Sequence, residues 1–119
     1  VSKSDDWLAQ VNEEVLEPSL PIVDPHHHLW TYDPPGAYLI EDLWADTGSG
    51  HCVEQTVFIQ CGAEPRKDGP KEMRFVGETE FVVAQAAKSE RGPSNAARIR
   101  GIVAFADLTL GARVDAVLE

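Results

Sequence analysis

The sequence has no apolar run that could cross a membrane, because a membrane-spanning helix needs about 20 consecutive, mostly apolar residues. Residues 1–6 are polar and acidic, and they lack the apolar segment of a secretory signal. These two absences predict a soluble, cytoplasmic protein without a membrane partner.

Basic residues are also scarce. The chain has 10 Lys and Arg against 20 Asp and Glu, which gives a formal net charge of −10. No basic cluster is longer than Arg66-Lys67. Because excess negative charge repels phosphate backbones and anionic lipids, we predict no nucleic-acid partner and expect a small-molecule substrate instead. A homo-oligomer remains open.

Cysteine is limited to Cys52 and Cys61, which do not have the C-x-x-C spacing of a redox or zinc motif. Two cysteines in a chain without an export signal do not indicate a disulfide framework. We expect both to be free thiols.

Apolar periodicity and turn residues predict helices that alternate with strands. The expected elements are a leading helix that ends before Pro18, a strand at 20–23, a helix at 38–46, a strand at 55–61, a helix at 76–89, a strand at 98–107 and a helix at 110–119. The strands are far enough apart for crossover helices, so we predict an α/β fold of parallel strands. The last helix has no stop signal, and we therefore expect residues 1–119 to be a single domain truncated at its C-terminal end.

The most specific local motif is the run His26-His27-His28 at the end of the first predicted strand. Side chains alternate in an extended chain, so His26 and His28 point to the same side and His27 points to the other. Two converging imidazoles suit a divalent metal such as Zn²⁺, which needs further ligands for a catalytic site. The motif alone equally fits solvated or buried histidines, but the carboxyl end of a parallel strand favours a site.

Four neighbours of this motif are candidates for supporting roles. Gln60 ends the second strand and is either a hydrogen-bond donor to substrate or a buried residue satisfied by nearby backbone. Trp30 and Tyr32 either line a substrate wall or pack beneath the loop. Asp24 shares a face with His26, where it would orient an imidazole indirectly.

Other acidic residues have simpler explanations. Glu78 and Glu80 lie at the start of a predicted helix, where the helix dipole favours negative charge. Asp107 follows the third strand and is placed to cap the next helix.

Four segments together resemble the amidohydrolase-related family of TIM-barrel metal hydrolases, in particular its lactonases. These segments are residues 22–30, 56–61, 76–82 and 101–108. The resemblance implies that the chain is the N-terminal portion, about three β/α units, of a (β/α)8 TIM barrel. It also implies that His26 and His28 bind a divalent metal, Zn²⁺ first, with a histidine and an aspartate from later strands. That aspartate, the general base, would lie beyond residue 119.

Three functions follow as alternatives. The first is a metal-dependent hydrolase that opens a lactone or related cyclic ester by attack of activated water on a carbonyl. Some lactonases of this family work without a metal, which leaves the cofactor open. The second is a decarboxylase or hydratase on the same barrel, and the third is a non-catalytic truncated fragment, because residues 1–119 alone are expected to be inactive.

Overall fold

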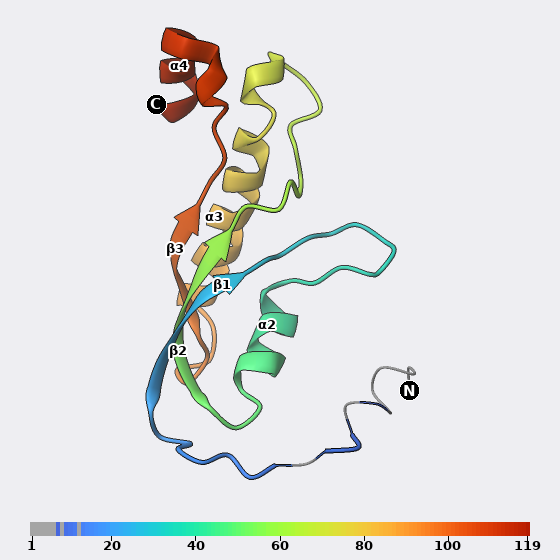
Figure 1. Ribbon diagram of the computed structural model, residues 1–119, viewed down its shortest axis with the longest axis vertical. Helices are drawn as coiled ribbons and strands as arrows, with labels where there is room; N and C mark the ends of the chain where they lie inside the picture. Colours follow the sequence, from blue (N-terminus) through green and yellow to red (C-terminus); the bar gives the residue numbers. More distant parts are fainter. Residues whose placement is uncertain (1–6, 8, 12) are drawn as a thin grey trace.

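The computed structural model describes residues 7, 9–11 and 13–119 (Figure 1). The elements in chain order are β1 (Pro21–His27), α2 (Ile40–Thr47), β2 (Cys52–Ile59), the 3-10 helix η1 (Lys71–Met73), α3 (Val76–Glu90), β3 (Arg98–Val103), the 3-10 helix η2 (Leu108–Val114) and α4 (Asp115–Leu118). None of the helices in this described part is long and apolar enough to cross a membrane.

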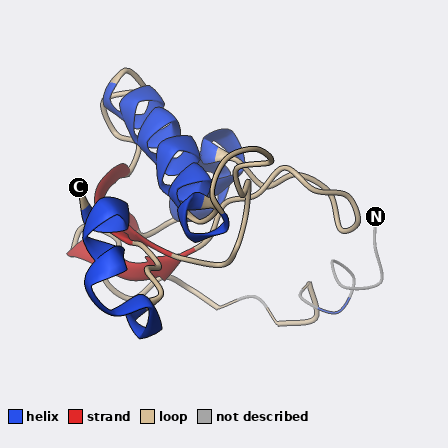
Figure 2. Ribbon diagram, turned by 90° about the horizontal axis from the view of Figure 1, so that it is seen from above, coloured by secondary structure: helices blue, strands red, loops and turns tan. Residues whose placement is uncertain are grey.

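The three strands form one parallel sheet in the order β1-β2-β3. Helix α2 connects β1 to β2, and α3 connects β2 to β3. Crossovers of the same hand between strands in sequential order place their helices on one face of the sheet, and Figure 2 shows α2 and α3 on the same side. The predicted α/β class with parallel strands is confirmed.

The hydrophobic core lies between this face of the sheet and the two helices. Phe58 of β2 is its centre, with 0% of its surface exposed. The other buried members are Leu29, Ile40, Leu43, Val82 and Ile99. Burying a side chain of this size contributes about 1.5–3 kcal/mol.

The opposite face of the sheet is more open. Val23 of β1 is 56% exposed and Val103 of β3 is 50% exposed. Apolar residues on a strand are normally covered by a second layer, and the exposure of these two valines shows that no layer of described residues covers this face. The described sheet and helices therefore form two layers, with the helices on one face of the sheet.

The prediction of a TIM-barrel portion is wrong. A barrel closes when its first and last strands pair, whereas in the described part of the chain β1 and β3 each pair only with β2 and remain the two edges of an open sheet. The described residues form a small α/β fold with three strands and the three α-helices α2, α3 and α4.

Several element bounds differ from the prediction. The leading helix falls partly on residues 1–6, 8 and 12, which lie outside the described residues, and the described residues 13–17 are not helical. Strand β1 extends through His27 instead of stopping at residue 23. In place of the last predicted helix the structure has η2 and α4, and Gly111, inside η2, interrupts the helical backbone with a φ of 59° and a ψ of −140°.

Candidate functional site

The three histidines follow an irregularity in the pairing of β1 with β2. Asp24 pairs with Thr56 and His27 pairs with Phe58, so Pro25 and His26 together oppose one residue of β2. This two-against-one arrangement is a β-bulge, which suits Pro25 because proline has no N–H for the ladder. The bulge changes the direction of the strand where the imidazoles leave it.

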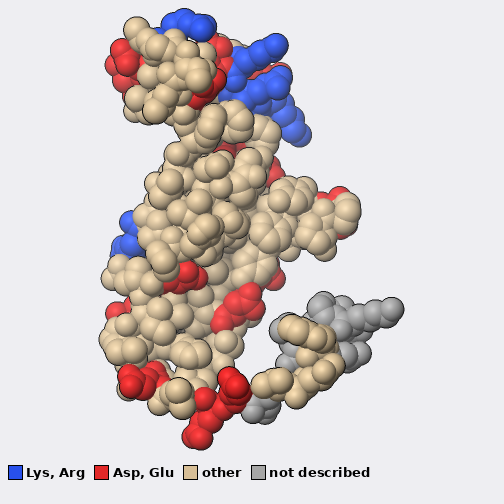
Figure 3. Space-filling model, in the orientation of Figure 1, with Lys and Arg blue, Asp and Glu red and all other residues tan. Residues whose placement is uncertain are grey.

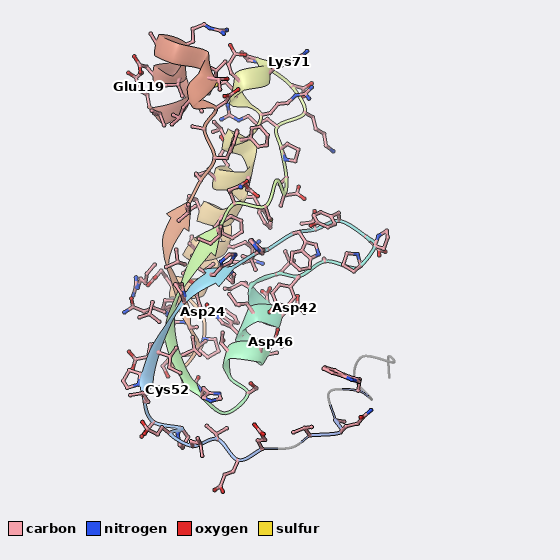
Figure 4. The ribbon with its side chains drawn as sticks, in the orientation of Figure 1. Asp24, Asp42, Asp46, Cys52, Lys71 and Glu119 are labelled. Carbon is pink, nitrogen blue, oxygen red and sulfur yellow. The ribbon has the colours of Figure 1, made fainter. Side chains whose placement is uncertain are left out.

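Asp24 stabilises the bulge. It lies midway along β1 (Figure 4), and its Oδ1 accepts a hydrogen bond from the backbone N–H of His26 at 3.0 Å. The carboxylate therefore satisfies a backbone donor that the bulge removes from the ladder. The structure places Asp24 on the backbone of His26, and it shows no contact of Asp24 with either ring of the pair among the described residues.

His26 and His28 point toward each other, as the alternation of side chains predicts. Their Nε2 atoms are 3.2 Å apart, and the two rings meet edge to face with centroids 4.9 Å apart. His26 is exposed, whereas His28 is partly buried. The two rings thus present their outer nitrogens to one common point at the surface.

A contact with β2 sets the proton position on His28. Its Nδ1 lies 2.8 Å from the carbonyl oxygen of Ile59. A carbonyl oxygen only accepts, so Nδ1 carries the proton and Nε2 of the neutral ring keeps its lone pair. With this tautomer of His28, the 3.2 Å contact requires Nε2–H of His26 to donate to the Nε2 lone pair of His28.

The spacing of the two nitrogens fits a shared metal ion. Two ligand nitrogens, each about 2.0–2.1 Å from a tetrahedral Zn²⁺, lie about 3.3 Å apart. A second hydrogen bond from the other ring nitrogen to a carbonyl is the usual support of a metal-binding histidine, and Ile59 provides it to His28. No group of three or more His, Cys, Asp or Glu among residues 7, 9–11 and 13–119 is placed to hold an ion, so the structure brings no third candidate ligand to the two histidines in that part of the chain.

His27 faces the opposite way, into the core. It is 7% exposed, and its ring lies against Phe58 with centroids 5.8 Å apart. Neither of its ring nitrogens has a hydrogen-bond partner among the described residues. Burial lowers the pKa of His27, because the charged imidazolium loses its hydration.

The aromatic candidates hold the loop after β1 together. Trp30 and Tyr38 form an isolated antiparallel bridge, and Nε1 of Trp30 donates to the carbonyl oxygen of Gly36 at 2.6 Å. The Trp30 ring stacks on the rings of both Tyr32 and Tyr38. Trp30 therefore packs within its loop, while Tyr32 stays 49% exposed.

Gln60 continues the sheet with its backbone. Its N–H donates to the carbonyl oxygen of Val103 at 2.9 Å, one residue beyond the end of β2. The structure gives its partly buried side chain no hydrogen bond with a described residue. A contact of that amide with a substrate remains a prediction.

Glu78 has a role that the sequence does not reveal. It is 2% exposed, and its Oε1 accepts hydrogen bonds from the backbone N–H groups of Cys61 and Ala63 at 2.9 and 2.8 Å. The carboxylate therefore fixes the chain that follows β2. In the sequence, only its position in the first turn of a predicted helix could have indicated this contact. A favourable interaction with the helix dipole accounts for a glutamate at that position equally well.

The two remaining acidic candidates are surface residues. Glu80 pairs with Arg66, and this ion pair lowers the pKa of the carboxyl. Asp107 accepts hydrogen bonds from the N–H and hydroxyl of Thr109, which lower its pKa, so its predicted role as a helix cap is confirmed. Cys52 and Cys61 are both free, and burial raises the pKa of the Cys61 thiol.

Comparison of the chain with protein-family models, with curated proteins and with solved structures found no match.

Proposed function

We propose that His26 and His28 are two ligands of a divalent metal ion, for which Zn²⁺ is the first candidate. The protein would be a hydrolase of the amidohydrolase type that opens a lactone or related cyclic ester. The observation that carries the proposal is the locked orientation of His28. Its Nδ1 is held by the carbonyl of Ile59 while its Nε2 lies 3.2 Å from Nε2 of His26. A solvated pair of histidines would have no reason to be fixed in this way.

The residues of the site would act through their ring protons. His28 has its Nε2 lone pair available before any ion arrives, because Ile59 holds the proton on Nδ1. His26 would move its proton from Nε2 to Nδ1 to free the second lone pair. When bound, the ion would supply Lewis-acid activation of a carbonyl and of a water molecule. Asp24, by holding the backbone N–H of His26, would keep that ring in place.

Metal titration of single variants tests the ligand assignment. Calorimetry should detect one Zn²⁺ per wild-type chain, and His26→Ala and His28→Ala should each lower the affinity for Zn²⁺ more than tenfold. Removal of a residue that only hydrogen-bonds to a metal ligand already lowers metal affinity about 10–100-fold, and removal of the ligand itself should cost at least as much. His51→Ala is the matched control, because His51 is exposed and precedes β2 at the other end of that strand. Equal affinity of all four proteins would contradict the assignment.

The proton positions give a readout independent of activity. In ¹⁵N-edited NMR spectra, His28 should be the Nδ1–H tautomer both with and without Zn²⁺, and His26 should change from Nε2–H to Nδ1–H when the ion is added. An Nε2–H tautomer of His28 in the metal-free protein would exclude the contact on which the proposal rests.

Substrate panels separate the hydrolase from its alternative. The protein that carries this sequence would be assayed with lactones and with aromatic carboxylic acids, in parallel with its His28→Ala variant. Turnover of lactones that His28→Ala abolishes would support the hydrolase. Turnover of aromatic acids alone would replace it by a decarboxylase or hydratase, and no turnover by a metal-loaded protein would reject both reactions.

A further inference from the structure

A cavity of about 700 Å³ opens between the chain segments that follow β1 and β2. Its size is within the range of about 300–1,000 Å³ that is typical of small-molecule sites. Residues that line it include Thr31, Tyr32, Glu64, Lys67, Arg74 and Phe75. Open α/β sheets bind ligands outside the carboxyl ends of their strands, and this cavity lies at that end of the sheet.

The cavity is basic although the chain is acidic. The chain has 10 Lys and Arg in all, and four of them, Arg66, Lys67, Lys71 and Arg74, fall in residues 66–74 against the two acidic residues Asp68 and Glu72. The lining itself has three basic residues, Arg66, Lys67 and Arg74, and one acidic residue, Glu64. Figure 3 shows Lys and Arg side chains gathered near this end of the molecule, and Figure 4 locates it by the label of Lys71. A local excess of one charge in a chain of opposite charge indicates a ligand of complementary sign.

Two of these cations are available to a ligand. Arg66 is engaged in the ion pair with Glu80. The side chains of Lys67 and Arg74, in contrast, have no hydrogen bond or ion pair with any residue in the part of the chain that the structure describes. Glu64, the acidic lining residue, accepts a hydrogen bond from the hydroxyl of Thr31.

The wall that carries Glu64 is held rigidly. Glu64 has a φ of 48°, in the left-handed region that residues other than glycine seldom adopt. A Cβ atom on Gly77 would come within 2.5 Å of Glu64 O and Arg66 N, so α3 begins in direct backbone contact with this wall. Strain that the surrounding structure maintains is often found at binding sites.

Aromatic rings provide the apolar part of the cavity. Tyr32 is 49% exposed, and its ring is supported from behind by Trp30 at a centroid distance of 5.8 Å and an interplanar angle of 20°. Phe75 is 37% exposed and rests against Phe105, with centroids 4.5 Å apart. Both rings are therefore positioned by a second ring and still offer surface to a ligand.

We propose that this cavity binds a small organic anion, with a carboxylate or phosphate group between Lys67 and Arg74 and a flat body against Tyr32 and Phe75. Arg74 supplies the planar, bidentate donor group that oxyanions accept, and Lys67 adds a point charge. None of the lining residues belongs to the histidine pair, so binding in this cavity can be measured without the proposed metal.

Binding of matched probes to the metal-free chain tests the proposal. Benzoate and phenyl phosphate carry the two candidate anions, and benzamide is the neutral analogue of benzoate with the same shape. In NMR titrations, at least one anion should shift the resonances of Thr31, Gly62 and Arg74, and benzamide should bind about tenfold more weakly than benzoate, since a charged hydrogen bond exceeds the 1.4 kcal/mol of a tenfold change. The tighter of the two anions identifies the group recognised.

Variants locate the anion. Arg74→Gln should weaken binding about tenfold and Lys67→Gln about threefold, because the exposed lysine is more strongly screened. Arg100→Gln is the control, since Arg100 is an exposed arginine paired with Glu90 and does not line the cavity. Equal binding of benzamide and benzoate, unchanged binding by Arg74→Gln, or no response to either anion would each overturn the proposal.

Discussion

His27 lies between the two histidines of the proposed metal site, but its ring is enclosed by the core. Both of its ring nitrogens lack a hydrogen-bond partner among the described residues, and burial lowers its pKa. An unsatisfied buried polar group costs about 1–3 kcal/mol, so His27 is a cost to folding even in its neutral form.

The titration of His27 makes stability depend on pH. In the unfolded chain its pKa is the ordinary 6.5, and in the folded chain it is lower, so the unfolded state binds the proton more readily. The contribution of the neutral His27 ring to the free energy of unfolding is therefore fully present above pH 6.5, and it is lost as the pH falls from there through the folded pKa. Urea unfolding between pH 7.5 and 5 should show this loss in the wild type, and His27→Leu should reduce it and be the more stable protein at every pH.

The replacement of His27 by leucine keeps the approximate volume and removes the polar atoms, so a changed core is not the expected outcome. His51→Leu, at an exposed position, should leave the pH dependence of unfolding unchanged. A pH dependence in His27→Leu equal to that of the wild type would show that other groups cause it.

At the scale of elements, α3 is attached to the sheet through its first turn. Glu78→Gln should lower the free energy of unfolding by about 1–3 kcal/mol, because the buried carboxylate serves two backbone N–H groups and the amide loses the charge. Glu80→Gln is the matched control, two residues away on the exposed side of the same helix, and should have little effect. Chemical denaturation of both variants decides the point, and equal losses would contradict the anchoring role of Glu78.

The elements themselves were largely predictable from local sequence. Helix α3 was expected at 76–89 and spans Val76–Glu90, since the segment mixes apolar and small residues and Gly92-Pro93 follows it. The extension of β1 was not predictable, because the bulge at Pro25 and His26 depends on the register with β2. That register is set by contacts between segments about 30 residues apart, which local periodicity does not contain.

The candidate site also has some features that local sequence predicts and others that depend on tertiary packing. Convergence of His26 and His28 follows from the alternation of side chains along an extended chain, and the structure has this convergence. The contact of His28 with the carbonyl of Ile59 joins two strands, and Glu78 reaches back to the chain after β2 from the next helix. Both depend on tertiary packing, so residue type and spacing did not reveal them.

At the scale of the molecule, the pattern predicted parallel β/α units but not how many strands the sheet would join. Each unit is a local feature, whereas closure depends on whether the two edge strands meet. In the structure β1 and β3 remain edges, and the apolar core lies on one face. The chain has a radius of gyration of 17.1 Å, compared with about 13.5 Å for a compact domain of this length. An extended molecule with a small core gains little free energy of folding from apolar burial, so repulsion between its charges has more influence on its stability.

The formal net charge of −10 produces repulsion between side chains that opposes the compact state. The described ion pairs are Arg66–Glu80, Lys88–Glu41 and Arg100–Glu90, and all six side chains are more than a third exposed, so the pairs oppose this repulsion only weakly. Salt shortens the screening length from about 30 Å at 0.01 M to about 8 Å at 0.15 M and acts mainly on the repulsion. The melting temperature at pH 7 should therefore rise by a few degrees over this range of NaCl.

Near pH 4.7, the isoelectric point of the sequence, the net repulsion vanishes and the same addition of salt should no longer raise the melting temperature. Circular dichroism melts at the two pH values and two salt concentrations provide the comparison. A melting temperature that falls with salt at pH 7 would mean that the three ion pairs outweigh the net charge. In that case Arg100→Gln, which breaks one pair and makes the net charge more negative, should remove part of the salt effect rather than increase it.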